Sequence, residues 1–183
     1  YLNSPMAIKA TEIFCRHHKE HKLSGADCEL IDDKTEFVRT VEASIELDAV
    51  RYPCIIISAS GMASGGRVLH HLKSLLPNYR NSVIFAGFQA PGTRGDALVN
   101  GADKVKIHGE YWPVKAEIFS LDSMSAHGDY KEILNWLEQG SLNPQKVYIT
   151  HGEMVASDTM RKHISETFGW DVEVPELFEE VEI

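Results

Sequence analysis

Two short histidine motifs, Ser125-Ala126-His127-Gly128-Asp129 and Thr150-His151-Gly152-Glu153, decide how the rest of this 183-residue chain is interpreted. The run Lys146 to Thr150 is β-branched and aromatic, which predicts a strand with His151 directly after its end. His127 precedes a helical pattern that starts near residue 130, with Asp129 placed to cap the helix. Because α/β proteins place their chemistry at such loop ends, the pair predicts one convergent site.

Composition and charge narrow the class of protein. An apolar content of 43% supports an adequate core, and the net charge of −9 argues against a broad basic surface for nucleic acid, so any nucleic-acid contact must be local. Three cysteines without a C-x-x-C pair favour free thiols in a reducing compartment. No apolar run approaches the length of a membrane span, and no signal segment opens the chain. We therefore expect a cytoplasmic protein with no membrane partner.

The first fifty residues predict two structural helices. Ser4 and Pro5 form a helix start, and a second helix is expected from about Thr35 to Leu47. His17 and His21 share a helix face, which would suit a metal, but they lack the intervening Glu of a zincin and lie in a charged, solvated helix end.

The middle of the chain predicts two strand-loop-helix units. Pro53 to Ser58 fits a parallel strand buried on both faces; it feeds a small-residue loop that runs to Arg67 and then a helix. Free amides and a helix N-terminus attract phosphate, although a tight structural turn or a nucleotide-binding loop are alternatives. The strand Ser82 to Phe88 leads into a second loop, which should lie beside the first in a parallel, doubly wound sheet.

Arg94, in that second loop, is the natural phosphate clamp, because a guanidinium forks onto phosphate oxygens; a surface salt bridge is the alternative. Beyond it, the alternation from Val105 to Ile118 predicts a strand pair that turns around His108-Gly109-Glu110. His108 is interpreted as a turn residue rather than a ligand.

Both histidine motifs, in the contexts FSLDSMSAHGD (119–129) and VYITHGE (147–153), resemble the C-terminal histidine motifs of β-CASP metallo-β-lactamase-fold nucleases. The two glycine loops resemble the same family. The resemblance covers nearly the whole chain and implies a β-CASP domain over residues 1–118 followed by the C-terminal part of a metallo-β-lactamase αββα fold over residues 119–183. In the second part it implies a helix from Tyr130, a helix from Asp158 to Phe168 and a terminal strand from Glu173 to Ile183, with Trp136, Leu134 and Leu137 in the core by their spacing.

The resemblance also implies the roles of single residues. His127 would assist catalysis beside the metals, and His151 would be a metal ligand. RNA contacts are expected from the glycine loops and the first histidine motif, at Ser60, Gly61, Met62, Ser64, Arg67, Arg94 and Ser125. The function implied is zinc-dependent hydrolysis of RNA phosphodiester bonds in RNA processing or decay.

One family feature is missing from the chain. The upstream His-x-His-x-Asp-His string that supplies the main metal ligands does not occur in it. A catalytic zinc needs about three protein ligands, and one matched ligand cannot hold it. We therefore expect a C-terminal segment of a longer enzyme, inactive and without stable zinc by itself, whose intact form holds two zinc ions. Its partners would be RNA and the upstream metallo-β-lactamase segment, with a homodimer also possible. A non-catalytic RNA-binding or scaffold paralogue is the alternative.

Overall fold

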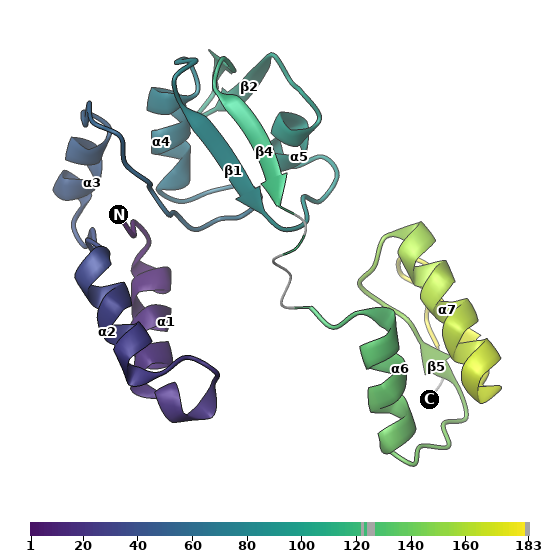
Figure 1. Cartoon of the computed structure of the whole chain (residues 1–183). Coiled ribbons are helices and arrows are strands. Elements are labelled where there is room, and N and C mark those ends of the chain that lie inside the picture. The colour runs from purple at the N-terminus through teal and green to yellow at the C-terminus, as the bar shows by residue number, and fades with distance from the viewer. Residues whose placement is uncertain (122, 124–126, 182–183) are drawn as a thin grey trace. The chain divides into compact units, whose positions relative to one another are not determined.

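The computed structural model describes residues 1–121, 123 and 127–181. The chain divides into two compact units, Tyr1–Ser125 and Ala126–Ile183, which we call unit 1 and unit 2 (Figure 1). No helix in the described part of the chain is both long enough and apolar enough to span a membrane.

Unit 1 opens with α1 (Pro5–Arg16), which begins where the sequence predicts. The Ser4 hydroxyl accepts a hydrogen bond from the Ala7 N–H at 3.2 Å, and Pro5 occupies the first turn, where its missing N–H has no cost. A short 3₁₀ turn, η1 (His18–Glu20), follows. The next helix, α2 (Gly25–Lys34), is one that we did not predict, and it starts in a capping box.

The helix predicted from Thr35 to Leu47 is wrong in its first half. Only α3 (Val41–Leu47) is helical, and Thr40 caps it by accepting a hydrogen bond from the Ala43 N–H at 3.1 Å. Before Thr40 the chain is extended: Phe37 and Leu2 form a parallel bridge, in which the Leu2 N–H donates to the Glu36 carbonyl at 2.9 Å. Backbone groups used in this bridge cannot also close helical hydrogen bonds.

The predicted strand from Pro53 to Ser58 is also not buried as expected. It is reduced to one parallel bridge between Ile57 and Leu2, and Ile55 is 77% exposed. The Leu2 segment supplies the backbone partner along one edge, but the described residues do not cover the apolar side chains.

The core of unit 1 lies under a parallel pair of strands, β1 (Ser82–Ala86) and β4 (Glu117–Leu121) (Figure 1). The helices α4 (Val68–Leu75) and α5 (Arg94–Val99) contribute to this core. The hairpin of β2 (Lys104–Ile107) and β3 (Glu110–Pro113) contributes too. The buried apolar residues that these elements and their loops share are Ala63, Leu69, Leu72, Leu76, Phe85, Leu98, Val105, Ile107 and Ala116.

The opposite face of the β1–β4 pair is apolar and exposed, with Ile84, Phe119 and Leu121 on it. Parallel sheets are normally covered on both faces. The fold is thus α/β with small parallel sheets, as expected at the level of class, and a doubly wound sheet stays a prediction.

Unit 2 alternates helix and strand. Its elements are α6 (Tyr130–Gln139), β5 (Val147–Tyr148), α7 (Met154–Phe168) and β6 (Val172–Glu173). β5 and β6 pair in parallel, with Val147 opposite Val172. α7 starts four residues earlier than predicted, and the terminal strand is much shorter than the predicted run to Ile183, whose last two residues lie outside the described part.

The core position predicted for Trp136 is wrong. Its side chain is 69% exposed, whereas Leu134 and Leu137 on the same helix are half-buried. Helical spacing places these three residues within one broad stripe, but α7 contacts only part of α6, so the stripe is wider than the buried face.

Candidate functional site

His151 occupies the junction between β5 and α7 in a rare backbone conformation. Its φ is 71°, in the left-handed region that non-glycine residues seldom adopt, and its side chain is exposed. The following Gly152 lies tightly against α7: a Cβ built there would be 2.4 Å from the Ser157 hydroxyl oxygen. Such a conformation costs on the order of 1–3 kcal/mol and is concentrated at functional sites. His151 therefore lies at the start of α7 in a backbone conformation that is typical of functional sites.

His127 lies two residues before the cap of α6. The Asp129 carboxylate accepts hydrogen bonds from the N–H groups of Lys131 and Glu132 at 2.8 and 2.9 Å, and the Glu132 carboxylate accepts one from the Asp129 N–H at 2.8 Å. This reciprocal capping box explains the aspartate of the first motif as a helix start. It also confirms the predicted cap.

Both histidines lie at the same end of unit 2. Because α7 connects two parallel strands, it runs antiparallel to them, and its N-terminus lies at the carboxyl end of β5. Figure 1 shows the N-terminal ends of α6 and α7 at that same end. Ser125, predicted to contact RNA, lies outside the described residues.

The residues present do not complete a metal site. Among the residues that the structure describes, no three His, Cys, Asp or Glu side chains are grouped closely enough to hold a metal ion. An exposed imidazole such as His151 can supply one ligand, whereas a catalytic zinc needs about three. The earlier histidine pair is used otherwise, since His17 contacts Glu20 at 3.1 Å and His21 stacks on Phe14 with ring centroids 3.7 Å apart.

In unit 1, the loop from Ser60 to Arg67 is stabilised by hydrogen bonds to the side chain of Ser60. Ser60 has φ 76°, and its hydroxyl accepts hydrogen bonds from the N–H groups of Ser64 and Gly65, both at 3.2 Å. Two of the amides that were candidates for phosphate therefore have a partner within the loop. A Cβ at Gly61 or Gly66 would meet no atom within 4 Å, so the space above these glycines is open.

The second loop lies beside the first, as predicted. The Gly95 N–H donates to the Met62 carbonyl at 2.9 Å. Arg94 joins the same loops, because its Nη1 donates to the Ala63 carbonyl and its Nε to the Lys106 carbonyl, the latter at 2.8 Å. Two donor groups of Arg94, the predicted phosphate clamp, are therefore used in hydrogen bonds within the protein.

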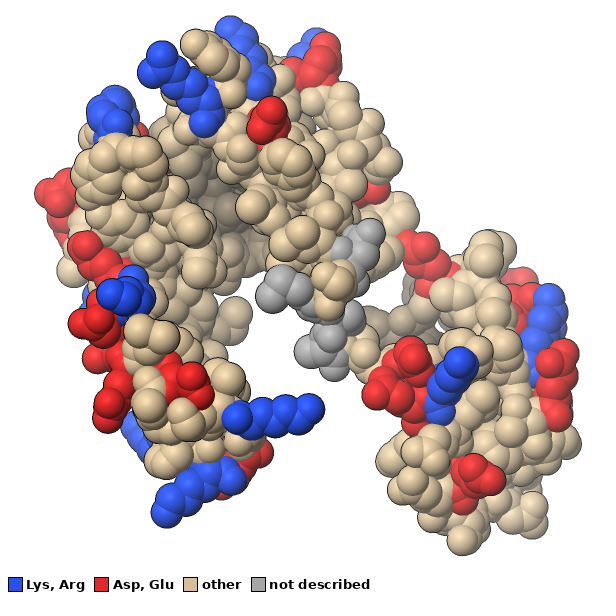
Figure 2. All heavy atoms as spheres, in the orientation of Figure 1, with Lys and Arg blue, Asp and Glu red and all other residues tan. Residues whose placement is uncertain are grey.

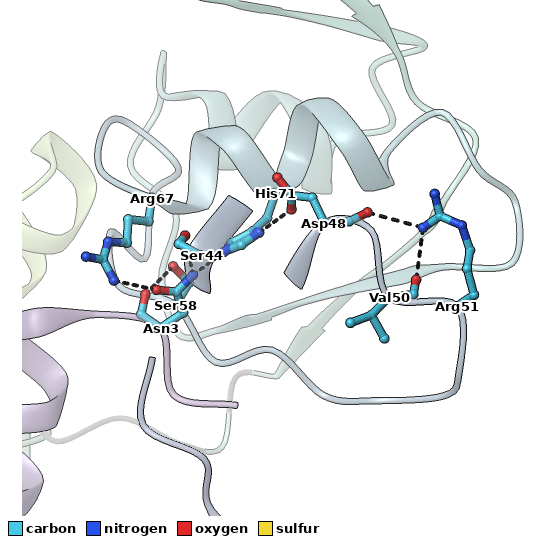
Figure 3. Close-up of polar contacts among 8 residues, drawn as sticks. All are labelled: Asn3, Ser44, Asp48, Val50, Arg51, Ser58, Arg67 and His71. Atoms are coloured by element: carbon cyan, nitrogen blue, oxygen red, sulfur yellow. Dashed lines mark hydrogen bonds and ion pairs between the residues drawn. The ribbon is translucent and has the colours of Figure 1, made fainter. Parts of the chain in front are cut away.

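Arg67 likewise binds protein atoms. Its Nη1 donates to Asn3 Oδ1 at 2.7 Å (Figure 3). The same Nη1 donates to the Val38 carbonyl at 2.9 Å, and Nη2 donates to the Arg39 carbonyl at 3.2 Å. The guanidinium therefore ties the start of α4 to two segments that are distant in sequence.

Behind Arg67 lies a buried polar chain that the sequence did not reveal (Figure 3). Asn3 is 0% exposed and His71 is 4% exposed. Asn3 Nδ2 donates to Ser44 Oγ at 2.7 Å and contacts His71 Nε2 at 2.7 Å, and His71 Nδ1 lies 2.6 Å from an Asp48 carboxylate oxygen.

The hydrogen bonds assign the tautomer of His71. Because Arg67 donates to the Asn3 carbonyl oxygen, the Asn3 amide nitrogen faces His71 and donates to Nε2, so the proton of the neutral imidazole is on Nδ1, toward Asp48. The burial of His71 could have been predicted from the sequence, because His71 lies on the apolar face of its helix, three residues after Val68 and four before Leu75.

Comparison with known proteins identifies two family domains in this chain. Residues 1–98 match the Beta-Casp domain, and residues 111–175 match the Zn-dependent metallo-hydrolase RNA specificity domain. The two matches together define the class: the chain combines a Beta-Casp domain with a domain of the Zn-dependent metallo-hydrolase type. The chain belongs to the β-CASP family of metallo-β-lactamase-fold nucleases, as the histidine motifs predicted.

Several relatives are similar to large parts of the chain. Ribonuclease TTHA0252 of Thermus thermophilus is 34% identical over 160 residues, 84% of this chain and 36% of that protein. Transcription termination factor FttA of Pyrococcus abyssi is 33% identical over 67% of this chain and 20% of that protein. An RNase J-like protein of Methanocaldococcus jannaschii is 38% identical over 57% of this chain and 24% of that protein. The chain spans little more than a third, or less, of the length of these relatives.

Proposed function

We propose that this chain is the C-terminal segment of a zinc-dependent ribonuclease that hydrolyses RNA phosphodiester bonds in RNA processing or decay in the cytoplasm. The observation that carries the proposal is the placement of His127 and His151 before two helices at one end of unit 2, in a chain that matches both family domains. Two zinc ions, when bound, would activate water and polarise the phosphate.

In this proposal, the chain's own residues divide the work. His151 binds a metal as neutral imidazole, held in place by its left-handed backbone and by the close approach of Gly152 to α7. His127 stabilises developing charge or gives a proton to the leaving oxygen, because an imidazole can donate a proton as a general acid. The remaining metal ligands belong to the upstream metallo-β-lactamase segment, which makes this chain inactive by itself.

The proposed architecture follows the family. Residues 1–118 would form the β-CASP domain with its doubly wound sheet, and residues 119–183 the last strands and helices of the metallo-β-lactamase fold. RNA would contact Ser60, Gly61, Met62, Ser64, Arg67, Arg94 and Ser125. The structure adds a condition for Arg67 and Arg94: since both donate to backbone carbonyls, any loss of RNA binding on their removal must be compared with the loss of stability. The proposal also includes a second copy of the protein as a partner, in a homodimer.

The decisive experiment separates the two histidines in the complete protein. His151→Ala should lower the zinc content, whereas His127→Ala should keep the zinc and lower the rate of RNA cleavage, by roughly 10²–10⁴-fold for a lost proton donor. His17→Ala, at an exposed histidine in unit 1, is the control for both measurements. Equal loss of zinc in both variants would show that the roles are divided wrongly.

A second measurement tests the alternative of a non-catalytic paralogue. The complete protein is assayed for hydrolysis of single-stranded RNA before and after chelation and after zinc is returned. Hydrolysis that is lost and regained supports the ribonuclease; RNA binding without hydrolysis under every metal condition would favour the scaffold.

A further inference from the structure

The hairpin of β2 and β3 presents lysines and a tyrosine on one face. Val105 and Ile107 are buried, so the alternation along β2 directs Lys104 and Lys106 to the opposite, exposed face. Across the ladder, Lys106 pairs with Tyr111, whose side chain is 65% exposed. The turn between the strands is tight, with positive φ at His108 and Gly109, which sets this register.

Both lysines approach the same aromatic ring. The Nζ atoms of Lys104 and Lys106 lie 5.5 and 6.0 Å from the centroid of the Tyr111 ring. Within the described part of the chain, neither lysine forms an ion pair, although eight other contacts of that kind occur there. Two ammonium groups therefore flank an exposed ring and are available to anions. We call these three residues the hairpin face.

The hairpin face is linked to the loops of unit 1. Arg94, which binds the Ala63 carbonyl of the first loop, also donates to the Lys106 carbonyl. On α4, Lys73 lies over the ring of Trp112, 5.1 Å from its centroid. Figure 2 shows Lys and Arg side chains gathered along the part of unit 1 where Figure 1 places α4 and β2.

The chemistry of the hairpin face suits single-stranded nucleic acid. An exposed ring accepts a base by stacking, every base has a π face, and flanking ammonium groups neutralise the adjoining phosphates. The net charge of −9 leaves such a local group of cations as the means of holding a polyanion. An acidic peptide would use the lysines but has no planar base to stack on Tyr111.

We propose that the hairpin face, Lys104, Lys106 and Tyr111, is an accessory binding surface for single-stranded RNA, with one base stacked on Tyr111 and the neighbouring phosphates on the two lysines. This proposal rests on the proposed function in taking RNA as the substrate. It adds a contact that tolerates any sequence, because neither a tyrosine face nor an ammonium group reads base edges.

The test measures affinity of the complete protein for an unstructured, fluorescent RNA oligonucleotide as a function of salt. Tyr111→Ala should weaken binding by roughly 5- to 150-fold, the equivalent of one lost base stack, and Tyr111→Phe should restore it. The double variant Lys104→Ala/Lys106→Ala should reduce the slope of log affinity against log salt by about 1.4, at about 0.7 for each phosphate contact. Tyr79→Ala and Lys34→Ala remove an exposed tyrosine and an exposed lysine elsewhere in unit 1 and are the matched controls.

The outcomes separate this proposal from the function on which it rests. If the parent protein binds RNA and the hairpin variants bind with unchanged affinity and slope, the hairpin proposal is overturned and the ribonuclease is not. If the lysine variant loses affinity but Tyr111→Ala does not, or if a poly-glutamate peptide competes as well as RNA, the face is a general anion surface and the proposal is again overturned. If the parent protein binds no RNA in any salt, the proposed function fails. Thermal unfolding of each variant confirms that the exposed substitutions leave the fold intact.

Discussion

Gly152 brings the second histidine motif against α7. Ser157 is buried, and its hydroxyl oxygen lies 2.4 Å from the position that a Cβ on residue 152 would occupy. His151, with positive φ, immediately precedes this contact in the chain. The absence of a Cβ at this glycine therefore leaves room for the Ser157 hydroxyl.

Gly152→Ala should destabilise unit 2, because the new Cβ and the Ser157 hydroxyl cannot both keep their positions. The cost should be smaller when Ser157→Ala is present, since the remaining neighbours lie at 3.6 and 3.7 Å, an ordinary contact distance. Urea unfolding of the two single variants and the double variant measures this coupling. Strictly additive effects would mean that the loop moves away from α7 instead.

His71 belongs to a chain of polar contacts in which Asn3 and His71 itself are buried, so solvent does not replace a partner that Asn3 loses. Removing the imidazole by His71→Ala leaves the Asn3 amide and the Asp48 carboxylate without their shared neighbour. We expect a loss of roughly 1–3 kcal/mol in the free energy of unfolding, the usual cost of a buried polar group left unpaired. The control is His70→Ala on the exposed side of the same helix, which should change stability much less. Equal effects at the two positions would contradict the buried hydrogen bonds.

At the scale of elements, the pairing of β5 with β6 allows an ion pair to form between the two strand segments. Lys146 Nζ contacts the Glu173 carboxylate. The hydrogen bond between them raises the pKa of Lys146 above its ordinary value and lowers the pKa of Glu173 below its ordinary value. The strands have only two residues each, so this pair supports a short ladder.

The signs of these shifts predict a pH window. The contribution of Glu173 is present above its unfolded-state pKa and is lost as the pH falls through its lowered folded-state pKa. That of Lys146 is present below its unfolded-state pKa and is lost as the pH rises through its raised folded-state pKa. Lys146→Met and Glu173→Gln should therefore be non-additive in unfolding near neutral pH and additive at pH values below the folded-state pKa of Glu173. Additivity at neutral pH would show that solvent already screens the pair.

At the scale of the whole molecule, acidic residues outnumber basic ones in a chain that is proposed to bind RNA. The chain carries 27 acidic and 18 basic residues, and the exposed acids include Glu29 and Asp32 on α2. A field of this sign slows the approach of a polyanion at low salt without touching the binding residues.

Neutralising these acids by Glu29→Gln/Asp32→Asn in the complete protein should raise the association rate with single-stranded RNA in about 10 mM salt. The gain should fade toward about 150 mM salt, where the Debye length is about 8 Å. Stopped-flow fluorescence measures the rate, and Glu29→Asp/Asp32→Glu keeps the charge as a control. A gain that persists at high salt would point to a direct contact on α2 rather than a long-range field.

Much of the local structure could be predicted from the sequence. Ser4 with Pro5, Asp129 before α6, and His108 with Gly109 each act on residues within a few positions, so the sequence alone determined these helix starts and this turn. The two histidine motifs likewise indicated the family, because their residues are adjacent in the chain.

Only the tertiary structure decided which side chains are available. The donors of Arg67 and the amide of Asn3 join residues 64 and 68 positions apart, and no local pattern records such pairs. Exposure at Ile55 and Trp136 depended in the same way on whether another element covers them, which periodicity does not state. Caps and turns are stabilised by interactions between residues that are close in the sequence, whereas burial and long-range hydrogen bonds depend on how the whole chain packs. For this reason the sequence indicated the motifs, and the structure showed what holds them in place.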